Sequence, residues 1–353
     1  MDKKESFYWD LVKGAAIFLM LWGHCIQYCA LDDLSYMGNR VFRTIYSFHM
    51  PVFMLVSGYL FSFSFRKRDL ADLLHHRIRG MLHPIVMATF FNNVLLLLPR
   101  YLLNDHVDFL WGSLFLGIGE SLWFLWAVLY CSVLVGVCCK LTDNPCLQPA
   151  LAIAGAAVIL LVPQWNYTLF MYPYFVAGFF CGMYRKQAKR LYRLVRYAVL
   201  VIFPVMMTFY EKKHYIYVTP MFSEELGLAV SAQIDLFRWA IGFAGSIFML
   251  SLADLLLRLG ARVPAVGAFL RPVSLLGRNS LQIYCLSASL LSGYLPHMYR
   301  KFVSLIGGNL LAKNLMVYNF LATPIMAAIW ALILYAAVVL MKKSKLDKLV
   351  FGR

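Results

Sequence analysis

The chain has 353 residues, of which 61% are hydrophobic and 14% are charged. Soluble globular domains have roughly 45–50% apolar and about 25% charged residues. This composition, with a mean hydropathy of +0.69, therefore indicates an integral membrane protein and excludes an ordinary soluble domain. The formal net charge of +16 is better explained by basic loops on one side of a membrane than by a nucleic-acid partner, so we expect no nucleic acid.

Ten apolar stretches are about as long as a membrane-crossing helix, which needs roughly 17 to 25 residues. They are residues 9–30, 46–64, 83–103, 120–139, 148–163, 167–184, 195–211, 233–257, 273–294 and 318–341. The fifth is short, and residues 109–119 are apolar but too brief to cross, so we expect a re-entrant or interfacial segment there. The sequence thus predicts an all-α integral membrane protein with about ten transmembrane helices.

The longer external segments of this topology are residues 31–45, 104–119, 212–232 and 295–317. None is long enough for a catalytic domain, so we expect one transmembrane domain over residues 1–353, with any chemistry among the helices or at their mouths. Two broken helices at matching places in the two halves, a feature of many transporters, are not found.

Most of the 33 lysine and arginine residues lie in segments that would share one side of the membrane with the N-terminus. Loops rich in lysine and arginine stay in the cytoplasm, so both termini are expected there. The first span has no small-residue cleavage site and is expected to be a retained helix. The eight cysteines lie mostly within spans and show no disulfide framework or metal-binding spacing, so no metal is predicted.

The first span carries polar residues on a single face. Lys13 and His24 are separated by three helical turns plus about 20°, and by about 16 Å along the axis. Asp10 lies one turn before Lys13, and Gln27 lies one turn after His24. Such groups in a membrane helix usually face the bundle interior and mark a pathway or a site. The alternatives are that Lys13 reaches the interface with Asp10 as its partner, and that His24 bonds a neighbouring helix.

The second span begins with the residues SFHMPVFMLVSGYLF. Its expected start places Pro51 in the first helical turn, where proline is well tolerated, and His49 at a depth comparable to that of His24. The two histidines could then act together as a base and an orienting group. The alternative is that His49 caps the helix at the interface.

A basic segment, RKRDLADLLHHRIRGMLHP, follows the second span and carries Arg77 and Arg79. It could bind anionic lipid head groups or ligand phosphates, or it could serve only to fix the topology. The same alternatives hold for the basic residues between Arg185 and Arg196. Farther on, Arg278, Asn279 and Ser280 are expected at the cytoplasmic entry of the ninth span, where Asn and Ser can act as helix caps.

Five segments taken together, in order, resemble the motifs of the acyltransferase 3 family. They are YWDLVKGAAIFLMLWGH, FHMPVFMLVSGYLF, RIRGMLHP, SLWFLWAVLY and LGRNSLQIY. The resemblance covers nearly the whole chain, and the similar branch contains fucose 4-O-acetylase-like and polysaccharide-modifying O-acetyltransferases.

The resemblance implies that an acyl group, commonly acetyl from cytoplasmic acetyl-CoA, is moved to a hydroxyl of a cell-surface or lipid-linked glycan at a bacterial inner membrane. The essential histidine of the family corresponds to His24, and the histidine of the F-H-M-P motif corresponds to His49. The basic family positions correspond to Lys13, Arg77 and Arg79, which would bind the phosphates of CoA. Membrane lipids are further partners, and a homo-oligomer is left open.

Two departures from the family pattern bear on acceptor binding. In SLQIYCLS, Gln282 stands where relatives have an acid, and Ser287 stands where they have a histidine. His24 is expected to act as a general base in direct transfer. A covalent route through an acyl-histidine or an acyl-serine is the alternative. The competing hypothesis is a glycan or lipid-linked sugar exporter in which Asp10, Lys13 and His24 form a relay.

Overall fold

The computed structural model describes residues 2–29, 36–102, 118, 122–162, 165–288, 290–291 and 314–352. Within these ranges the regular secondary structure is entirely helical, which agrees with the predicted all-α class. The chain forms two compact units. Unit 1 comprises residues 1–46, 83–122 and 268–353, and unit 2 comprises residues 47–82 and 123–267. The two units are described separately.

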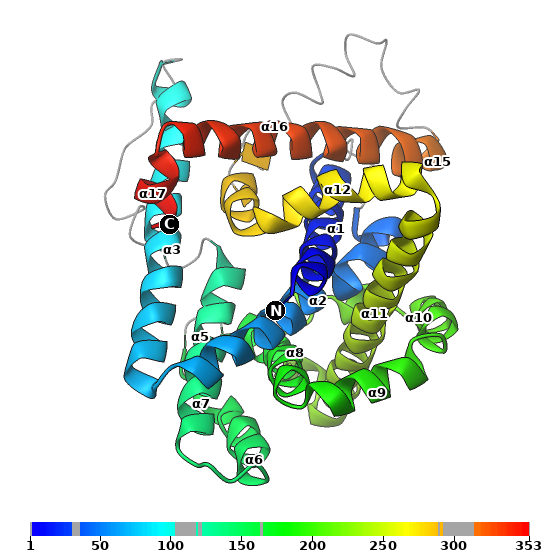
Figure 1. Cartoon of the computed structure of the whole chain (residues 1–353). Coiled ribbons are helices and arrows are strands. Elements are labelled where there is room, and N and C mark those ends of the chain that lie inside the picture. Colours follow the sequence, from blue (N-terminus) through cyan, green and yellow to red (C-terminus); the bar gives the residue numbers. More distant parts are fainter. Residues whose placement is uncertain are drawn as a thin grey trace. The chain divides into compact units, whose positions relative to one another are not determined.

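Unit 1 contains the first helix and the last helices of the chain (Figure 1). Its elements are α1 (Lys3–Tyr28), η1 (Tyr36–Gly38), the later part of α3 (Leu70–Leu102), α12 (Pro264–Arg278) from residue 268 onward, a helical stretch at 280–288, α15 (Leu315–Val317), the π-helical turn η4 (Tyr318–Ala322), α16 (Thr323–Lys343) and α17 (Leu346–Phe351).

Unit 2 contains the central helices. Its elements are most of α2 (Arg40–Lys67), the start of α3, α5 (Trp123–Lys140), α6 (Leu147–Ala154), α7 (Ala156–Ile159), α8 (Trp165–Met183), α9 (Arg185–Val195), α10 (Val199–Thr208), η2 (Lys212–His214), η3 (Glu224–Leu226) and α11 (Leu228–Arg262).

Antiparallel packing of α1 against α16 organises unit 1. The indole Nε1 of Trp22 donates to Oγ1 of Thr323 at 3.0 Å. Farther along α1, the backbone carbonyl of Ile26 accepts from the hydroxyl of Tyr318 at 2.8 Å. Residue numbers rise along α1 as they fall along the partner segment, so the two helices run in opposite directions. This is the direction expected for a first and a tenth membrane span.

The long helices of unit 2 run parallel to one another. Gly178 of α8 packs on the backbone of Leu55 in α2, and Gly182, one turn later, packs on Ser62. A Cβ atom at either glycine would overlap these neighbours, so the missing side chains permit the close approach. At the other end of α8, the ring of Tyr167 lies 5.1 Å from that of Trp123, the first residue of α5.

Because α5 and α8 run in the same direction, the chain between them must return to the end of unit 2 at which α5 begins. The short helices α6 and α7 lie in this return segment and contact α5 and α8 respectively. Gly155 separates them, and the hydroxyl of Tyr172 donates to the carbonyl of Ala152 at 2.6 Å. The predicted fifth span thus corresponds to a broken helix of limited length.

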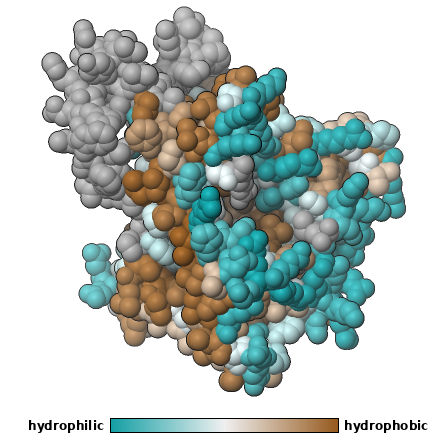
Figure 2. Space-filling model, turned by 60° about the vertical axis from the view of Figure 1, so that its left-hand side comes forward, coloured by the Kyte–Doolittle hydropathy of each residue, from teal (hydrophilic) through white to brown (hydrophobic). Residues whose placement is uncertain are grey.

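In the described part of the chain, five helices are long and apolar enough to cross a membrane, and the count is six if α9 and α10, bent by 67°, form one span. Large apolar side chains, among them Val201, Phe209, Leu332 and Leu340, remain exposed on these helices. Figure 2 shows broad apolar areas beside strongly hydrophilic ones. These features agree with an integral membrane protein. The re-entrant segment predicted at 109–119 lies almost entirely outside the described residues.

The position predicted for Pro51, in the first turn of the second helix, is wrong. Helix α2 already begins at Arg40, because Oδ1 of Asn39 accepts hydrogen bonds from the amides of Val41 and Phe42. Pro51 therefore lies inside the helix, where it has no amide hydrogen to donate. His49 is also internal, which excludes its interpretation as a helix cap.

Candidate functional site

The His24 ring is held by two neighbours through the same nitrogen. Its Nδ1 lies 3.3 Å from Oε1 of Gln27 and 3.3 Å from the hydroxyl of Tyr46. That hydroxyl also donates to Oε1 of Gln27 at 3.5 Å. Gln27 is the residue expected to share a helix face with His24, and the contact confirms that expectation.

The three contacts assign the proton on the imidazole. An amide oxygen only accepts hydrogen bonds, so the Nδ1 that faces Gln27 Oε1 carries a hydrogen. The Nε2 atom then carries the lone pair. Among the described residues, none forms a hydrogen bond with Nε2 of His24. This nitrogen is therefore available to accept a proton from a substrate.

Aromatic rings fix the orientation of the imidazole. The Tyr28 ring stacks on it with an interplanar angle of 12°, and the Tyr46 ring meets it edge-on at 90°. Gly23 permits the second contact, because a Cβ there would come within 2.6 Å of the Tyr46 ring. Sequence reasoning missed both tyrosines. The four-residue spacing on one helix could have identified Tyr28, whereas Tyr46 comes from another helix.

A cluster of charged residues lies toward the N-terminal end of α1. Nζ of Lys13 lies 2.9 Å from Oδ1 of Asp10, as the helical spacing predicted, and Nε of Arg278 lies 3.6 Å from Oδ2 of the same carboxylate. The Asp10 side chain is 11% exposed, whereas that of Arg278 is 63% exposed. The sequence did not predict that Arg278 would join this pair.

The other predicted site residues belong to unit 2. His49 is buried, with 2% of its surface exposed. The guanidinium of Arg77 lies 4.6 Å from the centre of the Phe61 ring and is partly buried, while Arg79 is exposed. Two residues apart on α3, these arginines point in different directions.

A further buried polar residue of unit 1, Asn92, lies on α3. Its Nδ2 donates to the backbone carbonyl of Cys285 at 2.8 Å, so this amide group already has an acceptor. Its buried Oδ1 has no hydrogen-bond partner among the described residues. Oδ1 can only accept, so this atom is suited to a hydrogen-bond donor of a substrate.

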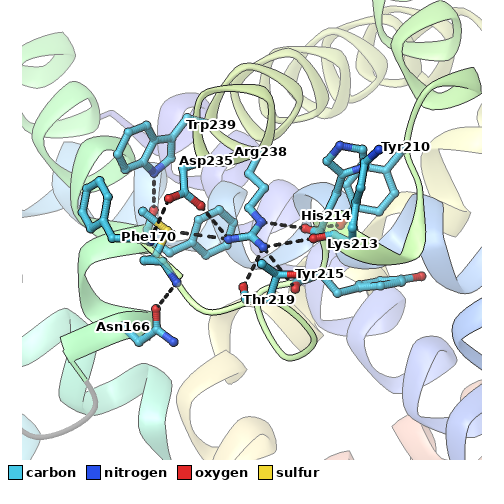
Figure 3. A network of polar contacts seen from close by, with 12 residues as sticks. Asn166, Phe170, Tyr210, Lys213, His214, Tyr215, Thr219, Asp235, Arg238 and Trp239 are labelled. Atoms are coloured by element: carbon cyan, nitrogen blue, oxygen red, sulfur yellow. Dashed lines mark hydrogen bonds and ion pairs between the residues drawn. The ribbon is translucent and has the colours of Figure 1, made fainter. Parts of the chain in front are cut away.

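Unit 2 contains a second polar network, centred on Arg238 (Figure 3). Arg238 is 1% exposed and pairs with Asp235 on the same helix at 2.7 Å. Its guanidinium also donates to four carbonyl oxygens of the preceding loop. These belong to Lys213, His214, Tyr215 and Thr219. The residue thereby fastens the loop after α10 to the start of α11.

The same loop is held at two further points. The second oxygen of Asp235 accepts from the amide of Phe222 at 3.1 Å, and Oδ1 of Asn166 accepts from the amide of Met221 at 2.6 Å. Nδ1 of His214 accepts from the amide of Glu211 at 2.8 Å, which requires the neutral ring. Burial, and next the ammonium of Lys213, lower the pKa of His214.

No group of three or more side chains suited to metal binding is found among the described residues. The described residues offer an oriented imidazole in unit 1 and separate cationic groups in both units.

Comparison with known proteins identifies relatives over most of the chain. The sequence profile of the acyltransferase 3 family, described as an acyltransferase domain, matches residues 6–341. The nodulation protein NolL of Mesorhizobium japonicum is 29% identical over 175 residues, which cover 48% of this chain and 46% of that protein. The nodulation protein NolL of Sinorhizobium fredii is 30% identical over 197 residues, covering 52% of this chain and 51% of that protein.

The chain thus spans about half the length of the curated relatives it matches. No solved structure matches it significantly.

Proposed function

Because the chain belongs to the acyltransferase 3 family, we propose that it transfers an acetyl group from cytoplasmic acetyl-CoA to a hydroxyl group of a cell-surface or lipid-linked glycan. The acetyl donor and the sugar acceptor follow from the resemblance of its motifs to those of sugar O-acetyltransferases. The observation that carries the proposal is the orientation of His24, which presents an unbonded Nε2 while Nδ1 is held by Gln27.

The reaction begins when Nε2 of His24 accepts the proton of the acceptor hydroxyl. The hydroxyl oxygen attacks the thioester carbonyl carbon, and the carbon–sulfur bond then breaks. The protonated His24 returns its proton to the departing thiolate, so the products are the sugar ester and CoA. General-base help of this kind typically contributes about 10² to 10⁴ in rate. Positioning of both substrates must supply the remainder.

The other predicted residues receive roles in this scheme. Gln27 fixes the tautomer of His24, and Asp10 supports Lys13. Lys13, Arg77 and Arg79 bind the phosphates of CoA, because guanidinium and ammonium groups pair well with phosphate. His49 acts on the acceptor side as a second catalytic group.

The proposal includes the topology. Residues 1–353 form a single acyltransferase domain with about ten spans in the bacterial inner membrane, and both termini face the cytoplasm. The parallel direction of α2, α5 and α8 supports the alternation of spans that this topology requires.

The test is transfer of radiolabelled acetyl from acetyl-CoA into glycan in membrane vesicles that contain the native acceptor. We expect alkali-labile label with the unchanged protein and a loss of at least about 100-fold in His24→Ala. His75→Ala is the matched control, because His75 is exposed on α3 and has no role in the scheme. Expression of each protein is compared by immunoblot.

Two outcomes contradict the proposal. Full transfer by His24→Ala would exclude His24 as the base. If the unchanged protein transfers no label but alters the distribution of glycan across the membrane, it would act as an exporter and the proposed acetyl transfer would be wrong.

A further inference from the structure

Three consecutive residues bring three helices of unit 1 together at one end. Gly277 packs against the backbone of Asp10 in α1, and Arg278 extends to the carboxylate of that residue. Asn279 follows, and its Oδ1 accepts a hydrogen bond from Nζ of Lys342 near the end of α16. The short segment 277–279 therefore joins α1 to α16. It is linked to Lys13 through Asp10 and to Lys342 through Asn279.

The charges of this cluster do not balance. Among the described ion pairs, Asp10 is the carboxylate that serves both Lys13 and Arg278. Lys342 is bonded to a neutral amide oxygen, which leaves its charge uncompensated. Lys13 and Arg278 thus share one carboxylate and Lys342 has none, so the cluster carries a net positive charge that attracts an anion with more than one negative charge.

The cations are held in position while their donor groups remain accessible. Asn279 is 4% exposed, and its Nδ2 donates to the carbonyl of Leu275 at 2.8 Å, which fixes the oxygen that holds Lys342. Arg278 contacts Asp10 through Nε and is 63% exposed. In the described part of the structure, its two terminal nitrogens form no hydrogen bond, and together they match two oxygens of a phosphate group.

We propose that Arg278 and Lys342, together with Lys13, bind a phosphate group of the acyl donor. This assignment rests on the proposed function and adds Arg278 and Lys342 to its donor site. The phosphate is taken to be that of the nucleotide part of CoA, because the cluster lies at the end of α1 that is expected to face the cytoplasm. A lipid phosphate offers the same chemistry, and the experiment separates the two sources.

The experiment compares the binding of CoA and 3′-dephospho-CoA to the purified full chain in nanodiscs of zwitterionic lipid, by titration calorimetry. We expect CoA to bind more tightly than the dephosphorylated analogue. Arg278→Gln and Lys342→Gln should each weaken CoA binding by about tenfold, as expected for the loss of a charge-assisted contact. Binding of the dephosphorylated analogue should change little.

Lys343→Gln is the matched control, because Lys343 is the exposed neighbour of Lys342 and forms no described bond within the cluster. It should leave the affinity for CoA unchanged. A second arm uses nanodiscs that contain phosphatidylglycerol, with bound lipid measured by mass spectrometry.

The outcomes separate this inference from the proposed function. If the unchanged protein binds CoA and the two variants bind both ligands as it does, the inference is overturned while the proposed function stands. If the variants retain less bound phosphatidylglycerol than the unchanged protein while their affinity for CoA is unchanged, the cluster binds lipid and the donor assignment is wrong. If the unchanged protein binds no CoA, both are overturned.

Discussion

Two polar contacts near the ends of α1 follow from helical spacing alone. Asp10 and Lys13 meet at 2.9 Å, and His24 and Gln27 meet at 3.3 Å. Residues three positions apart on a helix are neighbours, so the sequence could predict both pairs. It could not predict Tyr46 beside His24, because that contact also depends on Gly23 and on the packing of two helices.

Replacing Gln27 tests the importance of the histidine tautomer. In Gln27→Leu, Nδ1 loses the amide oxygen that holds its hydrogen, so we expect acetyl transfer to fall by roughly 10- to 100-fold. Gln27→Glu retains an acceptor and should retain more activity than Gln27→Leu. The measurement is initial transfer rate at saturating acetyl-CoA. Equal rates in the two variants would show that the acceptor is not needed.

A second expectation at the residue scale concerns His214, which lies outside the membrane spans. Its pKa is lowered by burial, whereas in the unfolded chain it takes up a proton near pH 6.5. Acid therefore favours the unfolded state. The stabilising contribution is complete above about pH 6.5 and is lost as the pH falls below that value.

The measurement is the thermal unfolding midpoint in detergent at pH 7.5 and pH 5.5. The midpoint should fall at the lower pH, and it should fall less in His214→Asn, whose amide oxygen can still accept from the amide of Glu211. Glu225→Gln serves as a control for a charge change at an exposed position of the same connecting segment. If the unfolding midpoint falls equally in His214→Asn and in the unchanged protein, protonation of His214 is not the cause of the acid destabilisation.

At the scale of helices, the approach of α12 to α1 depends on two glycines. A Cβ on Gly14 would overlap the carbonyl of Val273, and one on Gly277 would overlap the carbonyl of Asp10. Both obstacles are backbone atoms, which cannot rotate away. The helices must therefore separate if either glycine acquires a side chain.

Gly277→Ala should destabilise the protein by about 1–3 kcal/mol, the usual cost of overpacking, and should weaken CoA binding by moving Arg278. Gly80→Ala is the control, because a Cβ at Gly80 has no neighbour within 4 Å. It should stabilise α3 by roughly 0.5–1 kcal/mol, since alanine favours a helix. Thermal unfolding measures both effects. If Gly277→Ala is as stable as the unchanged protein, the contact is looser than described.

Helix boundaries show where sequence reasoning succeeds and fails. The apolar run predicted at 167–184 agrees with α8 (Trp165–Met183) within two residues. The run predicted at 46–64 is shorter than α2, because the first turns of this helix mix apolar residues with Arg40, Arg43 and Thr44 and so lack a continuous apolar signal. Asn39 alone marks its start, and a single cap residue is a weak signal beside a proline.

For the whole molecule, the direction of the helices explains the distribution of charge. The parallel helices α2, α5 and α8 end at the same end of unit 2, and basic residues lie at or just after their C-termini. These residues are Arg66, Lys67, Lys140, Arg185 and Lys186. Arg66 also donates to the carbonyls of Gly182 and Met183, which end α8. The sequence predicted that these basic segments share one side of the membrane, and the packing brings their charges to one end of unit 2.

The topology can be tested with a native cysteine. Cys146 is exposed and follows Lys140 at the end expected to face the cytoplasm. A membrane-impermeant maleimide should label it in inside-out vesicles and leave it unlabelled in intact spheroplasts. Glu224→Cys in a Cys146→Ser background should show the opposite pattern, because the loop before α11 is expected outside. Labelling of Cys146 in intact spheroplasts would show that the orientation of the chain is opposite to the proposed one.

The buried pair of Asp235 and Arg238 has a consequence for biogenesis. The loop that Arg238 fastens is synthesised before α11, so its carbonyls stay hydrated until that helix arrives. With the proposed topology, the start of α11 must be moved through the bilayer carrying a charged guanidinium, which is costly. Asp235 lies one turn away on the same helix, so the pair can form within the nascent helix and cross the membrane without net charge. Once α11 is inserted, the Arg238 guanidinium donates hydrogen bonds to the carbonyls of the preceding loop. Insertion of α11 therefore completes the folding of the segment before it.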